Sequence, residues 1–263
     1  MEALWSAKTA LNPLLFNGLK VHTLRTTADD ARPRLRFDIG LTDYKRYLAT
    51  NAAGTARIAE LTAAAVEAGH EPHAFLANPI GVDVICRTSD GFLIFLKRSA
   101  QVFEATGMWA SVGGHPEPHM LLHAVRGSAG AAAINEHPTA REVFDAVDGG
   151  DRGGALVVRE LFDAALREVE EELGLGADVM LTSATRLLGT FGAAWVEGKV
   201  DVVFAAETRL TMAQVRAWLD QVDADKAAAH AHTTAHAESV KRNISPYTRA
   251  ALDVYLRASK TEA

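Results

Sequence analysis

Residues 167–175 read Arg-Glu-Val-Glu-Glu-Glu-Leu-Gly-Leu, the most informative segment of the chain. It ends a segment, 159–173, whose apolar residues recur at the spacing of one helix face. Glu168, Glu171 and Glu172 stand at i, i+3 and i+4, so their carboxylates share one side of the predicted helix. Like charges at this spacing destabilise a helix by roughly 0.2–0.5 kcal/mol per pair. A divalent cation would offset that repulsion; the alternative is an acidic face that is simply solvated.

The order Arg-Glu-apolar-x-Glu-Glu-x-Gly-apolar resembles the second half of the Nudix box, and residues 167–175 match it at every specified place. The first half of that box, a glycine and then a glutamate, does not fit. Arg159 stands at the position of the glutamate, and Glu160 is one residue out of register. A more suitable glycine lies upstream, where residues 112–118 read Val-Gly-Gly-His-Pro-Glu-Pro. The box therefore resembles one that is split by an insertion, residues 119–154.

The interrupted box resembles the branch of UDP-glucose and UDP-galactose diphosphatases, Nudix type 22, which also read Gly-Gly-His-Pro-Glu-Pro. The resemblance runs from about Leu4 to about Phe204. Further similar stretches are residues 39–44, 50–51, 76–82, 92–99 and 158–162. The chain departs from this branch in its longer insertion and in a shorter segment after Val222.

The resemblance implies an α/β protein, a Nudix α/β/α sandwich with a mixed sheet, plus a smaller N-terminal α+β region. Residues 1–72 would form that N-terminal, substrate-binding region, and residues 73–263 the Nudix domain with its insertion 119–154. Apolar runs agree with a sheet and predict strands at 79–86, 92–97 and 108–112. Thr42 is the expected cap of a helix through Leu48.

Length, composition, net charge and cysteine count limit the classes of protein to which the chain can belong. At 263 residues, 48% hydrophobic and 23% charged, the chain has the composition of a soluble globular protein. Its net charge of −6 argues against non-specific binding to nucleic acid or to an anionic membrane. Cys86 is the one cysteine, which excludes an intrachain disulfide and is typical of a reducing compartment. With no apolar run of transmembrane length and no signal-peptide pattern, we expect a cytoplasmic protein.

The resemblance also implies a metal site, for which Mg2+ is the expected ion and Mn2+ the alternative. Glu168 and Glu172, one helical turn apart, are the predicted ligands, and Glu171 is a third ligand or the base that polarises water. Arg167 stands four residues before Glu171 and would orient it through a bidentate pair, so Glu171, Arg167 and Glu168 form the predicted catalytic set. The alternative for Arg167 is a surface ion pair worth about 0–1 kcal/mol.

Seven residues are predicted to bind substrate: Gly114, Lys97, Arg98, Phe16, Tyr44, Tyr47 and Asn51. Gly114 would let the backbone approach metal and phosphates. Lys97 and Arg98 would bind the diphosphate, and the alternative for them is a solvated strand end. The aromatic rings of Phe16, Tyr44 and Tyr47 would stack on a uracil, and the alternative is that they pack in the hydrophobic core. The asparagine would read polar edges of the base or ribose.

The expected reaction is Mg2+-dependent hydrolysis of UDP-glucose or UDP-galactose to UMP and the sugar 1-phosphate. Its partner is thus a small-molecule nucleotide sugar, with no nucleic acid and no membrane. One alternative is a Nudix hydrolase of another nucleoside diphosphate derivative, such as ADP-ribose. The other is a non-catalytic Nudix-like nucleotide-binding protein. The tract 223–243, with His230, His232 and His236, is read as a polar linker in preference to a metal site.

Overall fold

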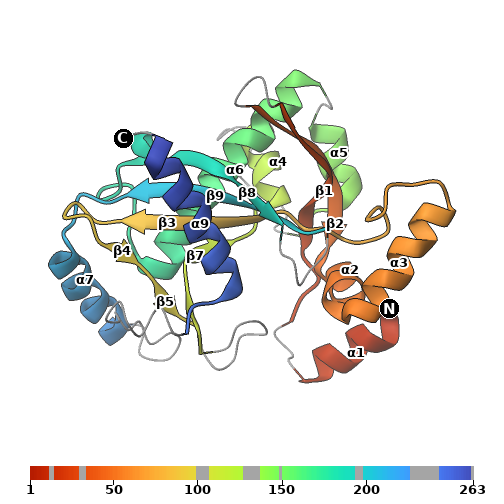
Figure 1. Cartoon of the computed structure of the whole chain (residues 1–263), viewed down its shortest axis with the longest axis horizontal. Helices are drawn as coiled ribbons and strands as arrows, with labels where there is room; N and C mark the ends of the chain where they lie inside the picture. Colours follow the sequence, from red (N-terminus) through yellow and green to blue (C-terminus); the bar gives the residue numbers. More distant parts are fainter. Residues whose placement is uncertain are drawn as a thin grey trace. The chain divides into compact units, whose positions relative to one another are not determined.

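The computed structural model (Figure 1) describes residues 1–11, 15–29, 34–98, 107–126, 137–147, 150–192, 198–225 and 243–261. The three histidines of the tract 223–243 lie outside these ranges. The chain divides into two units. Unit 1 comprises Met1–Gly81, His115–Leu161 and Gly192–Val200, and unit 2 comprises Val82–Gly114, Phe162–Phe191 and Asp201–Ala263. Both units are built from segments that are separate along the chain.

The main sheet has the strand order β4-β3-β9-β8, and β7 also pairs with β3. Its strands are β3 (Gly81–Arg87), β4 (Leu93–Ile94), β7 (Val112–Gly114), β8 (Arg186–Gly192) and β9 (Val200–Glu207). β3 is antiparallel to both β4 and β7. The arrows of β3 and β9 point the same way in Figure 1, so the sheet is mixed, as expected. β3 and β9 are buried along almost their whole length, which is typical of central strands.

Strand β9 shows why helices cover both faces of this sheet. Its neighbouring residues Val203 and Phe204 point to opposite faces. Val203 packs in a cluster with Ala251 of α9 (Pro246–Thr261). The Phe204 ring meets Phe162 of α6 (Asp151–Leu173) edge to face, with ring centroids 5.0 Å apart. The α/β/α arrangement that the resemblance implies is therefore present in unit 2, which also contains α7 (Met212–Asp225) and the short helix η3 (Thr182–Ala184).

Two predicted strands and the start of the acidic helix differ from the observed elements. The strand expected at 92–97 is two short strands, β4 and β5 (Leu96–Lys97), and the one expected at 108–112 is split by Ser111 into β6 (Trp109–Ala110) and β7. β5 and β6 pair with each other in a separate antiparallel sheet. The acidic helix begins at Asp151 and not near Arg159, so its first turns lie inside the segment expected as an insertion.

Unit 1 is organised around the antiparallel hairpin of β1 (Leu19–Asp29) and β2 (Arg34–Asp43). Its helices are α1 (Glu2–Leu11), α2 (Tyr44–Ala49), η1 (Asn51–Ala53), α3 (Thr55–Glu67), α4 (Pro118–Arg126) and α5 (Ala140–Ala146). Asp43, not Thr42, caps α2, because its Oδ1 accepts the N–H of Arg46 at 2.8 Å.

Residues 115–161, which follow Gly113 and Gly114, belong to unit 1 because several of them pack in its hydrophobic core. A buried cluster joins Leu121 and Leu122 of α4 to Val143 of α5 and Val157 of α6, and partly buried residues of the β1–β2 hairpin pack against it. Residues expected as an insertion thus supply half of a hydrophobic core. Among the helices of the described ranges, none has the length and apolar character needed to cross a membrane.

Candidate functional site

The glycines of β7 bring this strand into contact with the acidic helix of unit 2. A Cβ atom built on Gly114 would overlap with the carboxylate of Glu168, whose Oε2 would lie only 2.6 Å away. A Cβ on Gly113 would lie 2.6 Å from the carbonyl oxygen of Val82 on β3. A Cβ at Gly113 would meet fixed backbone of β3, and a Cβ at Gly114 would displace the Glu168 carboxylate, so the Gly-Gly pair is what allows that carboxylate to lie against β7.

Glu172 lies one turn further along α6, and its Oε2 accepts the N–H of Gly113 at 3.4 Å. Burial, and then the negative charge of Glu168, raise the pKa of Glu172 from 4.5 to about 8. The Gly113 N–H and the positive charge of Arg98 act in the opposite direction but do not compensate. Helix α6 thus presents two neighbouring carboxylates to β7, and the charge of Glu172 is disfavoured there.

This arrangement fits a divalent cation. Carboxylate oxygens are the ligands that Mg2+ and Mn2+ prefer, and Mg2+ is commonly held by one or two carboxylates with water in its remaining positions. Glu168 and Glu172 would be those ligands. Within the part of the chain that the structure describes, no group of three His, Cys, Asp or Glu side chains is arranged to hold a metal ion. Glu171, the predicted third carboxylate, is exposed on the helix surface.

The predicted cationic residues are placed differently from one another. Arg98 is partly buried, and its charge reaches Glu172. Its backbone is fixed by hydrogen bonds with Met108 and Gly107, of 2.9 and 3.1 Å. Lys97 is exposed, as expected for a solvated strand end, and Arg167 is partly buried on α6. The structure therefore brings Arg98 to the carboxylate pair.

The remaining predicted substrate residues belong to unit 1. Asn51 is buried, with 2% of its surface exposed. Its Oδ1 accepts the N–H groups of Ala77 and Asn78 at 3.0 and 2.9 Å, and its Nδ2 donates to Asn78 Oδ1 at 2.8 Å. Both ends of the Asn51 amide thus hold the chain at 77–78, where Asn78 has a φ of 39°. These contacts give Asn51 a structural role that its sequence context did not predict.

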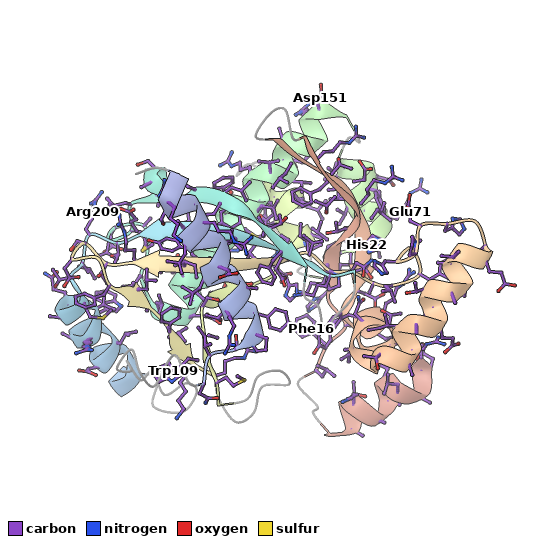
Figure 2. The ribbon with its side chains drawn as sticks, in the orientation of Figure 1. Phe16, His22, Glu71, Trp109, Asp151 and Arg209 are labelled. Carbon is purple, nitrogen blue, oxygen red and sulfur yellow. The ribbon has the colours of Figure 1, made fainter. Side chains whose placement is uncertain are left out.

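The predicted aromatic residues range from buried to exposed. Tyr47 is buried, with 7% of its surface exposed, which agrees with core packing, the alternative to base stacking. Tyr44 is partly buried, with its ring centroid 5.9 Å from that of Tyr47. Phe16, which is labelled in Figure 2, is 61% exposed, and its ring centroid lies 5.1 Å from that of His137. Exposed aromatic surface of this kind is compatible with base stacking at Phe16.

Unit 1 also contains a buried polar cluster that the sequence did not predict. Glu160, the residue out of register in the box, is buried, and its Oε1 accepts the N–H of Glu117 at 3.0 Å. The Glu117 carboxylate forms an ion pair with Lys20 of β1 at 2.7 Å. Burial, then the positive charges of Lys199 and Lys20, hold the pKa of His115 well below 6.5, so its imidazole is neutral at pH 7. The displaced glutamate therefore fixes the segment 115–117.

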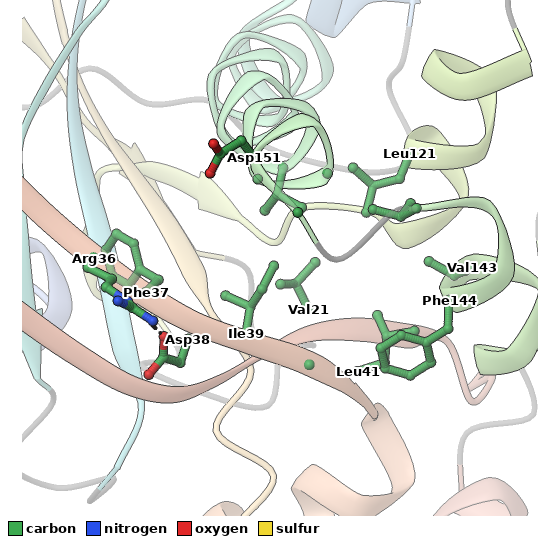
Figure 3. Close-up of a pocket in the computed structure, with 16 residues that line it drawn as sticks. Val21, Arg36, Phe37, Asp38, Ile39, Leu41, Leu121, Val143, Phe144 and Asp151 are labelled. Carbon is green, nitrogen blue, oxygen red and sulfur yellow. Dashed lines mark hydrogen bonds and ion pairs between the residues drawn. The ribbon is translucent and has the colours of Figure 1, made fainter.

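A cavity of about 710 Å³ lies elsewhere in unit 1, between β2, α4, α5 and the start of α6 (Figure 3). Its wall is largely apolar, with Val21, Ile39 and Leu121 facing it. Arg36 and Asp38, on its polar side, pair with each other at 3.1 Å. None of the residues that we predicted to bind metal or substrate lines this cavity.

Comparisons with known proteins give two kinds of result. No family model matches the chain. It is 32% identical over 220 residues to the uridine diphosphate glucose pyrophosphatase NUDT22 of Mus musculus, covering 83% of this chain and 64% of that protein. The NUDT22 protein of Bos taurus is 33% identical over 218 residues, with 81% and 67% covered. The chain thus spans about two thirds of the length of these relatives.

Among solved structures, a mutT/nudix family protein from Listeria innocua matches 56% of this chain and 94% of its own length. Its sequence identity is 15% and its TM-score 0.23, which is too low to support a conclusion about the fold.

Proposed function

Because the chain belongs to the Nudix hydrolase family, we propose that it hydrolyses the diphosphate of UDP-glucose or UDP-galactose, giving UMP and the sugar 1-phosphate, with Mg2+ as its cofactor and Mn2+ as a substitute. The observation that carries this proposal is the pair of carboxylates, Glu168 and Glu172, held against Gly113 and Gly114. The substrate follows from the relatives, which are named uridine diphosphate glucose pyrophosphatases. We extend that activity to this chain as a proposal, because it spans about two thirds of their length.

The chemistry of the substrate explains why such a site is needed. A diphosphate ester resists hydrolysis because its negative charges repel an incoming hydroxide. A divalent cation, when bound, neutralises that charge and lowers the pKa of water. Glu168 and Glu172 would hold the cation, and the glycines would let the backbone of β7 approach it closely.

Three other residues of unit 2 complete the proposal. Arg98 places a guanidinium beside Glu172, where it would bind a phosphate oxygen of the substrate. Glu171 remains our candidate for the base, and its exposure leaves it accessible to water. Arg167, four residues before it on α6, remains the candidate to orient it.

The test is a substrate panel followed by phosphorus NMR, with Mg2+ and with excess chelator. We expect UDP-glucose and UDP-galactose to give UMP and sugar 1-phosphate only when the cation is present. Glu168→Gln and Glu172→Gln should each reduce the rate by at least about 100-fold, because each removes a charged ligand. Glu170→Gln, on the exposed side of the same helix, is the matched control and should leave the rate unchanged.

Two outcomes would replace this proposal. Cleavage of ADP-ribose with intact UDP-glucose would keep the enzyme class and change the substrate. Binding of UDP-glucose without turnover of any member of the panel would identify a non-catalytic nucleotide-binding protein.

A further inference from the structure

The residues just before α9 lie alongside β6 and extend the small sheet that β6 forms with β5. Trp109 of β6 is buried, with 5% of its surface exposed. On the side away from β5, its N–H donates to the carbonyl oxygen of Asn243 at 2.8 Å, and its carbonyl oxygen accepts the N–H of Ser245 at 2.8 Å. β5 and β6 have two residues each, and a two-stranded pair is marginally stable alone. Residues 243–245 therefore support this pair.

Arg98 follows β5 directly, and one glycine connects its backbone to Asn243. The N–H of Gly107 donates to the Arg98 carbonyl oxygen at 3.1 Å, while the Gly107 carbonyl oxygen accepts from Asn243 Nδ2 at 3.0 Å. Gly107 has a φ of 70°, in the left-handed region that favours glycine. The Arg98 N–H donates to the neighbouring Met108 carbonyl oxygen at 2.9 Å. Asn243 thus binds the short segment that holds the Arg98 backbone.

The position of Arg98 matters for the chemistry of the site. Its positive charge acts on Glu172, one of the two proposed cation ligands. A guanidinium binds phosphate oxygens through N–H groups of fixed direction, so its effect depends on its orientation as well as on its charge. Misplacement of a binding group by about 1 Å can lower a rate by about 100-fold. A contact that fixes the Arg98 backbone is therefore expected to affect turnover.

We propose that Asn243 is a positioning residue for Arg98, which it holds, through Gly107, where the guanidinium meets the diphosphate of the substrate. This inference rests on the proposed function, in which Arg98 binds a phosphate oxygen. Asn243 acts on the substrate only through Arg98. The inference also gives a role at the site to the last residue of the tract 223–243, which the sequence alone indicated to be a polar linker.

The first test is hydrogen exchange of backbone amides, measured by NMR on the full chain without substrate. Asn243→Ala removes the Nδ2 donor and should speed exchange at the Arg98 and Gly107 N–H groups about 5-fold, which corresponds to the loss of one neutral hydrogen bond. The matched control is Gln214→Ala, which removes a bond of the same kind on α7, where Gln214 Oε1 accepts the Thr211 N–H at 2.9 Å. It should leave exchange at Arg98 and Gly107 unchanged.

The second test is a double-mutant cycle in kcat/KM for UDP-glucose with Mg2+. We expect Arg98→Ala to lower kcat/KM about 100-fold, since it removes a charged hydrogen-bond donor to phosphate. Asn243→Ala should lower it about 10-fold. The double variant should fall no more than about 2-fold below Arg98→Ala, because the group that Asn243 positions is then absent. Gln214→Ala should keep the parent's kcat/KM, and should unfold at the same temperature as Asn243→Ala.

Each other outcome overturns the inference. Unchanged exchange at Arg98 and Gly107 in Asn243→Ala would mean that the asparagine does not hold this segment. Additive losses in the cycle would mean that Asn243 does not act through Arg98. A clearly lower unfolding temperature for Asn243→Ala than for Gln214→Ala would show a general stabilising role instead. A parent that cleaves UDP-glucose in any of these cases rejects this inference alone, whereas a parent that cleaves no UDP-sugar rejects the proposed function and this inference with it.

Discussion

Replacing Glu172 by glutamine should stabilise the metal-free protein at alkaline pH. The folded protein holds the Glu172 pKa at about 8, whereas in the unfolded chain it is near 4.5. Because the folded-state pKa is the higher one, the stability associated with this proton is fully present below pH 4.5 and is lost as the pH rises to 8. The difference between the two pKa values corresponds to about 5 kcal/mol. A glutamine does not titrate, and its amide oxygen can still accept the Gly113 N–H.

The assay is urea unfolding in the presence of chelator, at pH 5 and at pH 8, for the parent, Glu172→Gln and Glu170→Gln. Tryptophan fluorescence reports on unit 2 through Trp109, which is 5% exposed. At pH 8 we expect Glu172→Gln to exceed the parent in free energy of unfolding by about 4 kcal/mol, and at pH 5 by about 1 kcal/mol or less. Addition of Mg2+ at pH 8 should stabilise the parent and Glu170→Gln, but not Glu172→Gln.

An equal loss of stability between pH 5 and pH 8 in the parent and Glu172→Gln would contradict this prediction. So would a Glu172→Gln variant that is less stable than the parent at pH 8 without metal. Either result would mean that the Glu172 carboxylate is not confined beside Glu168 as the structure describes.

Three further predictions concern packing. Gly114→Ala should reduce the rate of UDP-glucose hydrolysis by about 100-fold, because its Cβ displaces the Glu168 carboxylate. The control is Gly154→Ala, whose Cβ would meet no atom within 4 Å and which should keep the parent's rate. Asn51→Ala should lower the free energy of unfolding by about 2 kcal/mol in urea denaturation, since the buried Asn78 N–H loses its acceptor while the Ala77 N–H keeps Thr50 Oγ1. A loss below about 0.5 kcal/mol would contradict this. Burial, and then the charge of Glu207, raise the pKa of the Cys86 thiol to about 12. Iodoacetamide at pH 8 should therefore label this cysteine only in the unfolded chain. Rapid labelling of the folded protein would contradict the burial of Cys86.

The sequence predicted those features whose cause is local. Periodicity predicted the C-terminal part of α6. The glycines were expected to let the backbone approach metal and phosphates, which stays a prediction; the structure shows Gly114 against the Glu168 carboxylate. The start of α6 was missed because Gly153 and Gly154 have low helix propensity, and packing of Val157 in the unit 1 core outweighs it.

Features that depend on contacts distant in sequence were not predictable. The i, i+3, i+4 spacing placed Glu168, Glu171 and Glu172 on one side of a helix, but only docking of α6 decides that Glu171 faces solvent while Glu172 is largely enclosed. The Asn51 amide holds a backbone 26 and 27 residues further along the chain, and no local pattern indicates this.

The Glu168 carboxylate lies against the backbone of Gly114, with no side chain of β7 between them. Its position relative to β7 therefore depends on how α6 packs on the sheet. Val169 and Leu173, which follow Glu168 and Glu172 in the sequence, are fully buried and contribute to that packing. Core substitutions at these positions, which elsewhere alter only stability, would at this helix shift the cation ligands as well.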